Sequence, residues 1–173
     1  MTLKQYILHQ LREMQREMAT ALTGLTQDQL QTCPTGQNLH IAWMAQHCCA
    51  NVDIWLHRAI TGNFAISHSD RFINWPPPPP GESEPFPDAQ TLLDRWMRVS
   101  EAAISAIESL DEEDLHKPGQ TINQEPLVES CLRAINHQNA HLRQIWMILG
   151  HLGLSEERWP AQGAWLAHNE PSG

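Results

Sequence analysis

The sequence of 173 residues predicts an all-α four-helix bundle with the helices in the order up-down-down-up. Apolar residues recur at spacings of three and four along four segments, the pattern of helices with one buried face. No segment shows strand-like alternation of useful length. Five consecutive prolines, Pro76 to Pro80, lie between the second and third of these segments. Prolines lack the backbone donors that a helix interior or a central strand needs, so this segment is predicted to be a long connector.

The first helix is predicted to follow Thr2, which can cap it, and to stop at Gly24. Its apolar face holds Ile7, Leu11, Met14, Met18, Leu22 and Leu25. The stretch LTQDQLQTCPTGQ that follows is rich in turn-forming residues. We expect it to connect the first two helices.

The second helix is predicted to start near Asn38 and to run to Gly62. Its apolar stripe holds Ile41, Ala45, Cys48, Val52, Trp55 and Ala59. The long proline-rich connector that follows can return along the bundle, which allows the second and third helices to run in parallel.

The third helix is predicted to be capped by Asp88 and to end at the stretch DEEDLHKPGQ. Its stripe holds Leu92, Trp96, Val99, Ala103, Ala106 and Leu110. Pro126 suits the first turn of a fourth helix that continues to about Gly153. The connections on either side of the proline-rich segment are short, which favours antiparallel neighbours.

The chain is predicted to form a single domain over residues 1–173, with the bundle core over about 2–153. The tail, residues 154–173, is too short and broken for a fifth core helix. We expect Trp159 and Trp165 to hold it against the bundle or against a second subunit.

Charge and composition exclude several classes of function. The net charge is -9, from 20 acidic and 11 basic residues, without a basic cluster. Because affinity for nucleic acid depends on neutralising phosphates, a nucleic-acid surface is not expected. No apolar run is long enough to span a bilayer, and the amino terminus does not resemble a signal peptide, so we expect a cytoplasmic protein without a membrane partner. The four cysteines form no CxxC pair and are expected to be reduced.

Two histidines stand out on the fourth helix, His137 and His141, because they are four residues apart on or beside its inward stripe. Imidazoles at this spacing lie one turn apart on the same helix face and can reach a single metal ion. His47 in the second helix is a third candidate ligand, and one ligand from one helix with two from another is an arrangement that bundles support. The sequence therefore predicts a metal site made by His47, His137 and His141.

The remaining histidines have more ordinary interpretations. Five of them, His9, His57, His68, His116 and His168, are interpreted as exposed or hydrogen-bonded side chains. His40 and His151 are intermediate cases; His40 lies near the face of His47 but at the start of its helix, where capping is common. The residues between His137 and His141 include no glutamate, so an HExxH metalloprotease is disfavoured.

The segments LHIAWMAQH and HQNAHLRQI, in this order and separated by the long connector, resemble the DinB/YfiT family of metal-dependent bundle proteins. The resemblance spans nearly the whole chain. It implies that His47, His137 and His141 hold a divalent ion in a cleft open to solvent. The family often has a Trp-Ser start to the second helix where this chain has Leu39 and His40, which leaves open whether His40 enters the site. Gln144 matches a position that is often polar, and it could orient a ligand.

Three neutral histidines leave coordination positions for water or substrate, and imidazole suits several late transition metals, with zinc or nickel expected as isolated. The resemblance implies transfer of a low-molecular-weight thiol, such as mycothiol or bacillithiol, to a small electrophilic substrate. Hydrolysis by a metal-bound water and a non-enzymatic metal-binding or stress-response module are the alternatives. The family and the seven tryptophans favour a homodimer.

Overall fold

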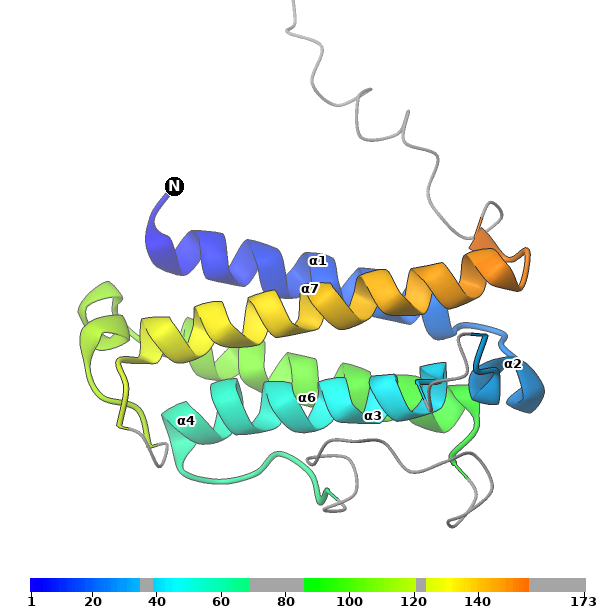
Figure 1. Cartoon of the computed structure of the whole chain (residues 1–173). Helices are drawn as coiled ribbons and strands as arrows, with labels where there is room; N and C mark the ends of the chain where they lie inside the picture. Colours follow the sequence, from blue (N-terminus) through cyan, green and yellow to red (C-terminus); the bar gives the residue numbers. More distant parts are fainter. Residues whose placement is uncertain (35–38, 69–85, 121–123, 156–173) are drawn as a thin grey trace, which may run out of the picture.

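Four long helical segments pack side by side in the computed structural model, which describes residues 1–34, 39–68, 86–120 and 124–155 (Figure 1). The predicted helical bundle is confirmed, and no strand is present in these ranges. The elements in chain order are α1 (Leu3–Leu22), α2 (Gln27–Gln31), α3 (Ile41–Val52), a π-helical turn (Asp53–His57), α4 (Arg58–Thr61), α6 (Ala89–Glu108), a 3-10 helix (Glu112–His116) and α7 (Leu127–His151).

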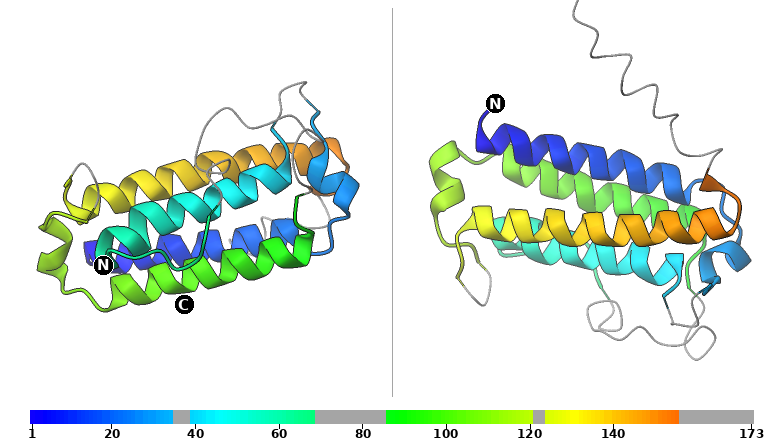
Figure 2. Two further views of the ribbon diagram at one scale, coloured as in Figure 1. Left: turned by 90° about the horizontal axis from the view of Figure 1, so that it is seen from below. Right: turned by 45° about the horizontal axis from the view of Figure 1, so that its top comes forward.

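The contacts between helices define the arrangement of the bundle. Both α1 and α3 pack against α6 and α7, so α1 and α3 lie diagonally opposite each other. Figure 2 shows α7 lying along both of them. The ammonium group of Lys4 donates to the carbonyl groups of Glu108 and Leu110, which places the start of α1 beside the end of α6. The N–H of Gln120 donates to the carbonyl of Ala59, which places the end of α4 near the start of α7.

Local sequence signals set most of the helix ends. Thr2 and Gln5 form a capping box at the start of α1, and Asp88 accepts a hydrogen bond from the N–H of Thr91 at the start of α6. Both caps were expected from the residue types, because their side-chain oxygens satisfy N–H groups that lack a partner inside the helix. Gly62 follows α4 with φ of 78°, a left-handed conformation that glycine adopts without strain.

The second helix differs from the prediction in two ways. It begins at Ile41, with His40 as its N-cap, and not near Asn38, which lies outside the described residues. Its α-helical course is interrupted by the π-helical turn, which is wider than an α-helical turn. Val52, Leu56 and Ala59 are buried, whereas Trp55, predicted on the stripe, is only half-buried.

The connections contain helices that the sequence did not predict. Helix α2 forms inside the turn-rich stretch after α1, where Thr26 and Gln29 make a second capping box. The acidic segment after α6 forms the 3-10 helix, so DEEDLHKPGQ ends the third helix as expected but is itself partly helical. The proline run, Trp159 and Trp165 lie outside the described residues.

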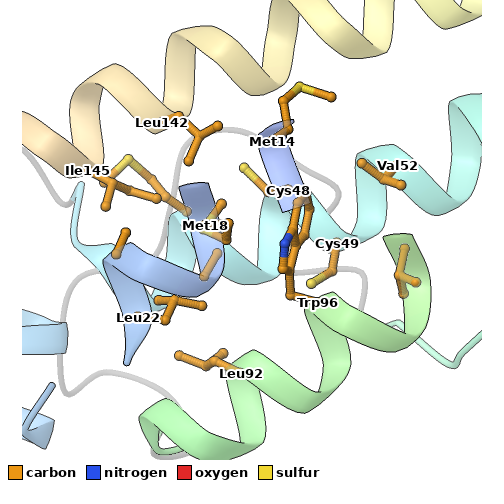
Figure 3. Packing of buried hydrophobic residues seen from close by; sticks show 14 of the residues in the cluster. Met14, Met18, Leu22, Cys48, Cys49, Val52, Leu92, Trp96, Leu142 and Ile145 are labelled. Atoms are coloured by element: carbon orange, nitrogen blue, oxygen red, sulfur yellow. The ribbon is translucent and has the colours of Figure 1, made fainter. Parts of the chain in front are cut away.

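The core lies between the four long helical segments. Figure 3 shows side chains from all four meeting there, and each labelled one is at most 2 % exposed: Met14, Met18 and Leu22 of α1, Cys48, Cys49 and Val52 of α3, Leu92 and Trp96 of α6, and Leu142 and Ile145 of α7. Removing apolar surface from water is the main force that stabilises such a bundle. Within the described ranges, no helix is long and apolar enough to cross a membrane.

Candidate metal centre

The three predicted ligands come together between α3 and α7. His137 and His141 lie one turn apart on α7, and His47 faces them from α3. The Nε2 atom of His137 lies 3.2 Å from that of His47 and 3.3 Å from that of His141. In the described part of the chain, these residues form the single group of three or more potential ligands with donor atoms within 4.8 Å of one another.

Contacts around the triad hold α3 and α7 in register. Gln138, which is fully buried between His137 and His141 in the sequence, donates from its amide nitrogen to the carbonyl of Cys48. The indole ring of Trp43 stacks on the His47 ring, with 4.5 Å between the ring centroids and 14° between the planes. These contacts fix the helix pair and one ring face at the point where the nitrogen atoms converge.

The surroundings keep the rings of α7 neutral. The pKa of both His137 and His141 is lowered to about 4, mainly by burial; the His141 and His47 rings contribute to the shift of His137, and the His47 ring contributes to that of His141. Two protonated rings this close would repel each other in an environment where water screens poorly. Near neutral pH both rings are therefore in the form that can bind a metal ion.

The nitrogen separations fit a common ion better than a set of mutual hydrogen bonds. Nε2 of His137 approaches two other ring nitrogens, but a neutral ring nitrogen carries either one hydrogen or one lone pair. Two nitrogens bound tetrahedrally to zinc at about 2.0–2.1 Å lie about 3.3–3.4 Å apart. The observed 3.2 and 3.3 Å are close to this separation, so the three imidazoles fit a divalent transition-metal ion.

Two amide side chains contact the triad. The Oε1 atom of Gln144 lies 2.7 Å from Nδ1 of His141, which places a hydrogen on Nδ1 and leaves the Nε2 lone pair toward the other rings. Asn51 lies beside His47, with its Nδ2 atom 3.2 Å from Nε2 of the ring. Nδ1 of His137 is buried and has no hydrogen-bond partner among the described residues. Gln144 was a candidate from the sequence, whereas Asn51 was not.

His40 does not join the triad. Its side chain is fully buried, and its Nδ1 atom accepts a hydrogen bond from the N–H of Trp43 as the N-cap of α3. Its ring also meets Phe86 edge-on at 4.4 Å between centroids. The capping role that the sequence allowed for His40 is therefore the one observed.

An apolar cavity of about 420 Å³ lies next to the triad. Gln144 links the two, because it lines the cavity and contacts His141. The other lining residues are mostly apolar: Pro34, Leu39, Met44, Met147, Ile148 and His151. A larger cavity, of about 780 Å³, is lined by residues 64–68 and by α6, and none of the three histidines lines either cavity.

A second polar cluster surrounds Asp53, whose carboxylate is fully buried in the π-helical turn. It accepts hydrogen bonds from the N–H groups of Ala65 and Ile66, and it contacts the His68 ring at 2.7 Å and the His57 ring at 3.3 Å. Burial acts to raise the pKa of Asp53, but these hydrogen bonds outweigh it and lower the pKa. The cluster ties the segment after α4 to the bundle, so His57 and His68 are hydrogen-bonded, one of the two roles expected for them.

Comparison with known families gives one match. The sequence model of the DinB superfamily matches residues 10–145, a range that includes all three histidines of the triad. No curated protein matches the chain, and no solved structure matches it.

Proposed function

We propose that this chain, which belongs to the DinB superfamily, binds one divalent transition-metal ion, zinc or nickel as isolated, through His47, His137 and His141 and transfers a low-molecular-weight thiol to a small electrophile. The observation that carries the proposal is the convergence of three imidazole nitrogens without a carboxylate among them. A divalent ion at this position would lower the pKa of a thiol or water bound to it. Neutral ligands leave the charge of such an ion uncompensated, which favours an anionic partner.

The ligand set favours a thiol over water as the attacking group. A free thiol has a pKa of about 8.5, whereas that of water is about 15.7, so the thiol needs far less help to ionise near neutral pH. Hydrolysis would also need a general base. Asp53 is the buried carboxylate on the helical segment of His47, and it is already engaged by His68 and by two backbone N–H groups.

The reaction would form one bond and break one. The thiolate sulfur would attack an electrophilic carbon and form a carbon–sulfur bond, while either the bond from that carbon to the leaving group or its π bond to the adjacent atom breaks and gives its electron pair to that group or atom. The proton released by the thiol goes to solvent or to the product. The apolar cavity beside Gln144 suits the apolar part of a small substrate.

The cysteines of the chain are poor candidates for the nucleophile, and burial raises the pKa even of the half-buried Cys33. Cys48, Cys49 and Cys131 are buried, and burial raises the pKa of Cys48 and brings those of Cys49 and Cys131 to about 12. The thiol form of such a side chain persists at neutral pH, and the thiol is a weak nucleophile. An added thiol is therefore the expected attacking group.

The test is a panel of small electrophiles assayed with and without added thiol, using protein loaded with zinc or nickel. We expect turnover that needs both thiol and metal, disappears in His137→Ala, and persists in Cys48→Ala and Cys49→Ala. Equal turnover without thiol would show hydrolysis instead. No turnover across the panel, with metal bound, would favour a non-enzymatic metal-binding or stress-response module.

We also propose that the protein is a cytoplasmic homodimer, as its seven tryptophans and the family suggest. Exposed apolar side chains on α7, Met147 at 70 % and Leu132 at 39 %, are available for such a contact. Sedimentation at micromolar concentration tests the dimer, and a monomer would refute it.

A further inference from the structure

The orientation of the Asn51 amide is fixed by its surroundings. Its Nδ2 atom lies 3.1 Å from the backbone carbonyl of His47, which can only accept a hydrogen bond. The nitrogen end of the amide must therefore face α3. The same nitrogen lies 3.2 Å from Nε2 of His47, so its second hydrogen points to that ring atom.

This orientation also determines the state of the His47 ring. Because Asn51 donates to Nε2, that atom carries a lone pair, the form in which it can bind a metal ion. The amide nitrogen is as close to Nε2 of His47 as Nε2 of His137 is. An N–H donor thus lies beside the convergence point of the three ring nitrogens.

A metal ion bound by His47 would use the same lone pair that accepts the hydrogen bond of Asn51. The amide would then lose one acceptor while it keeps the other, the carbonyl of His47. Its free hydrogen would remain next to the ligand atoms and would need a new acceptor. An anionic group that occupies an open coordination position of the ion would be the nearest acceptor for this hydrogen.

We propose that Asn51 donates a hydrogen bond to the exogenous anion, thiolate or small inorganic anion, that binds beside the triad. This inference rests on the proposed metal site. Asn51 then takes part in ligand binding, in addition to its hydrogen bond to the backbone carbonyl of His47. Asn51 is half-buried, so its amide can be reached from the site without unfolding α3.

The experiment uses the full chain loaded with cobalt(II), whose absorption reports the ion's ligands. Metal content is measured first, and then 2-mercaptoethanol and, separately, azide are titrated at a fixed neutral pH. The variants are Asn51→Ala, which removes the donor, and Asn51→Asp, which replaces it with a negative charge. The control is Asn139→Ala, since Asn139 lies on α7 between two of the histidines and has no hydrogen bond to the triad among the described residues.

We expect every variant to retain one cobalt ion per chain. Asn51→Ala should weaken binding of both probes about tenfold or more, the loss expected for a hydrogen bond to a charged group. Asn51→Asp should weaken it further, because the carboxylate repels the anion, while cobalt is held at least as tightly. Asn139→Ala should bind both probes like the parent.

Failure of the metal site and failure of this inference give different results. A parent protein that binds no cobalt refutes the proposed site and the inference together. Unchanged probe affinity in Asn51→Ala, with cobalt bound, refutes the inference alone. If azide binding depends on Asn51 but 2-mercaptoethanol does not bind to the parent, the hydrogen-bond donor is supported and the thiol function is contradicted.

Discussion

The metal-free protein should lose stability on mild acidification because the triad resists protonation. The pKa of His141 is about 4 in the folded chain, against an ordinary value of 6.5. Between these values the unfolded chain binds more protons than the folded chain, so the free energy of unfolding falls as the pH is lowered. The contribution of the neutral His141 ring to the free energy of unfolding is fully present above about pH 6.5 and decreases as the pH falls toward 4.

The size of the effect follows from these two pKa values. Going from about pH 7 to about pH 5, one ring with this shift costs about 2 kcal/mol of stability. His141 is only 7 % exposed, so this figure applies to it with little correction for solvent screening. The pKa of His137 is shifted in the same direction. Because this side chain is half-buried, we expect it to contribute less than His141 to the stability lost on acidification.

The perturbation that removes this term is His141→Leu, which takes away the titrating ring and keeps an apolar side chain in the buried position. Urea unfolding followed by circular dichroism, with a chelator present, gives the free energy of unfolding at both pH values. The variant should lose about 2 kcal/mol less than the parent between about pH 7 and about pH 5. His9→Leu is the control, because the His9 side chain is 55 % exposed. Equal losses in His141→Leu and in the parent would refute the assignment of the acid sensitivity to the triad.

Three further outcomes are expected. Elemental analysis should find one ion per chain in the parent and in His116→Ala, whose histidine is exposed, but almost none in His141→Ala; unchanged content there would exclude His141 as a ligand. Free zinc at about a hundred times its dissociation constant should stabilise the protein by about 2.7 kcal/mol in thermal melts, and no shift would contradict binding to the folded state. Asp53→Ala should cost about 2–3 kcal/mol in urea unfolding, because the N–H groups of Ala65 and Ile66 lose their acceptor. Since the pKa of Asp53 is lowered, its contribution to the free energy of unfolding is present above the ordinary value of 3.8 and is lost as the pH falls through the folded pKa. A cost of Asp53→Ala below about 0.5 kcal/mol at neutral pH would show that these contacts contribute little.

The parts of the fold that depend on local signals could be predicted from the sequence. Thr2 and Asp88 cap their helices because a short side chain with an oxygen reaches the first free N–H groups whatever the rest of the chain does. The spacing of His137 and His141 placed both rings on one face of α7 for the same reason. The pairing with His47 came from the family resemblance and from the packing habits of bundles, and the structure brings the three together.

The parts that depend on tertiary contacts could not be predicted. The π-helical turn inserts a residue into the helical repeat, and Trp55, which the apolar spacing placed on the buried stripe, is only half-buried. Asp53 looks like an ordinary exposed acid in the sequence, because its partners come from the segment after α4. The contact of Asn51 with the Nε2 atom of His47 depends on the position of that ring, which tertiary packing sets.

The triad is an arrangement that stability alone would not favour. Three imidazoles are grouped between α3 and α7, where the pKa of His137 and His141 is lowered. Nδ1 of His137 has no hydrogen-bond partner among the described residues. A buried polar atom without a hydrogen bond costs about 1–3 kcal/mol, and apolar side chains on the same stripe would avoid this cost. Gln144 nevertheless holds the His141 ring with its Nε2 lone pair toward the other rings, and Asn51 donates a hydrogen bond to the Nε2 lone pair of His47. Ring nitrogens whose lone pairs converge destabilise the metal-free chain, and a bound ion would offset this cost through coordination. The metal-free protein should therefore be the less stable form, which the thermal melts with zinc measure.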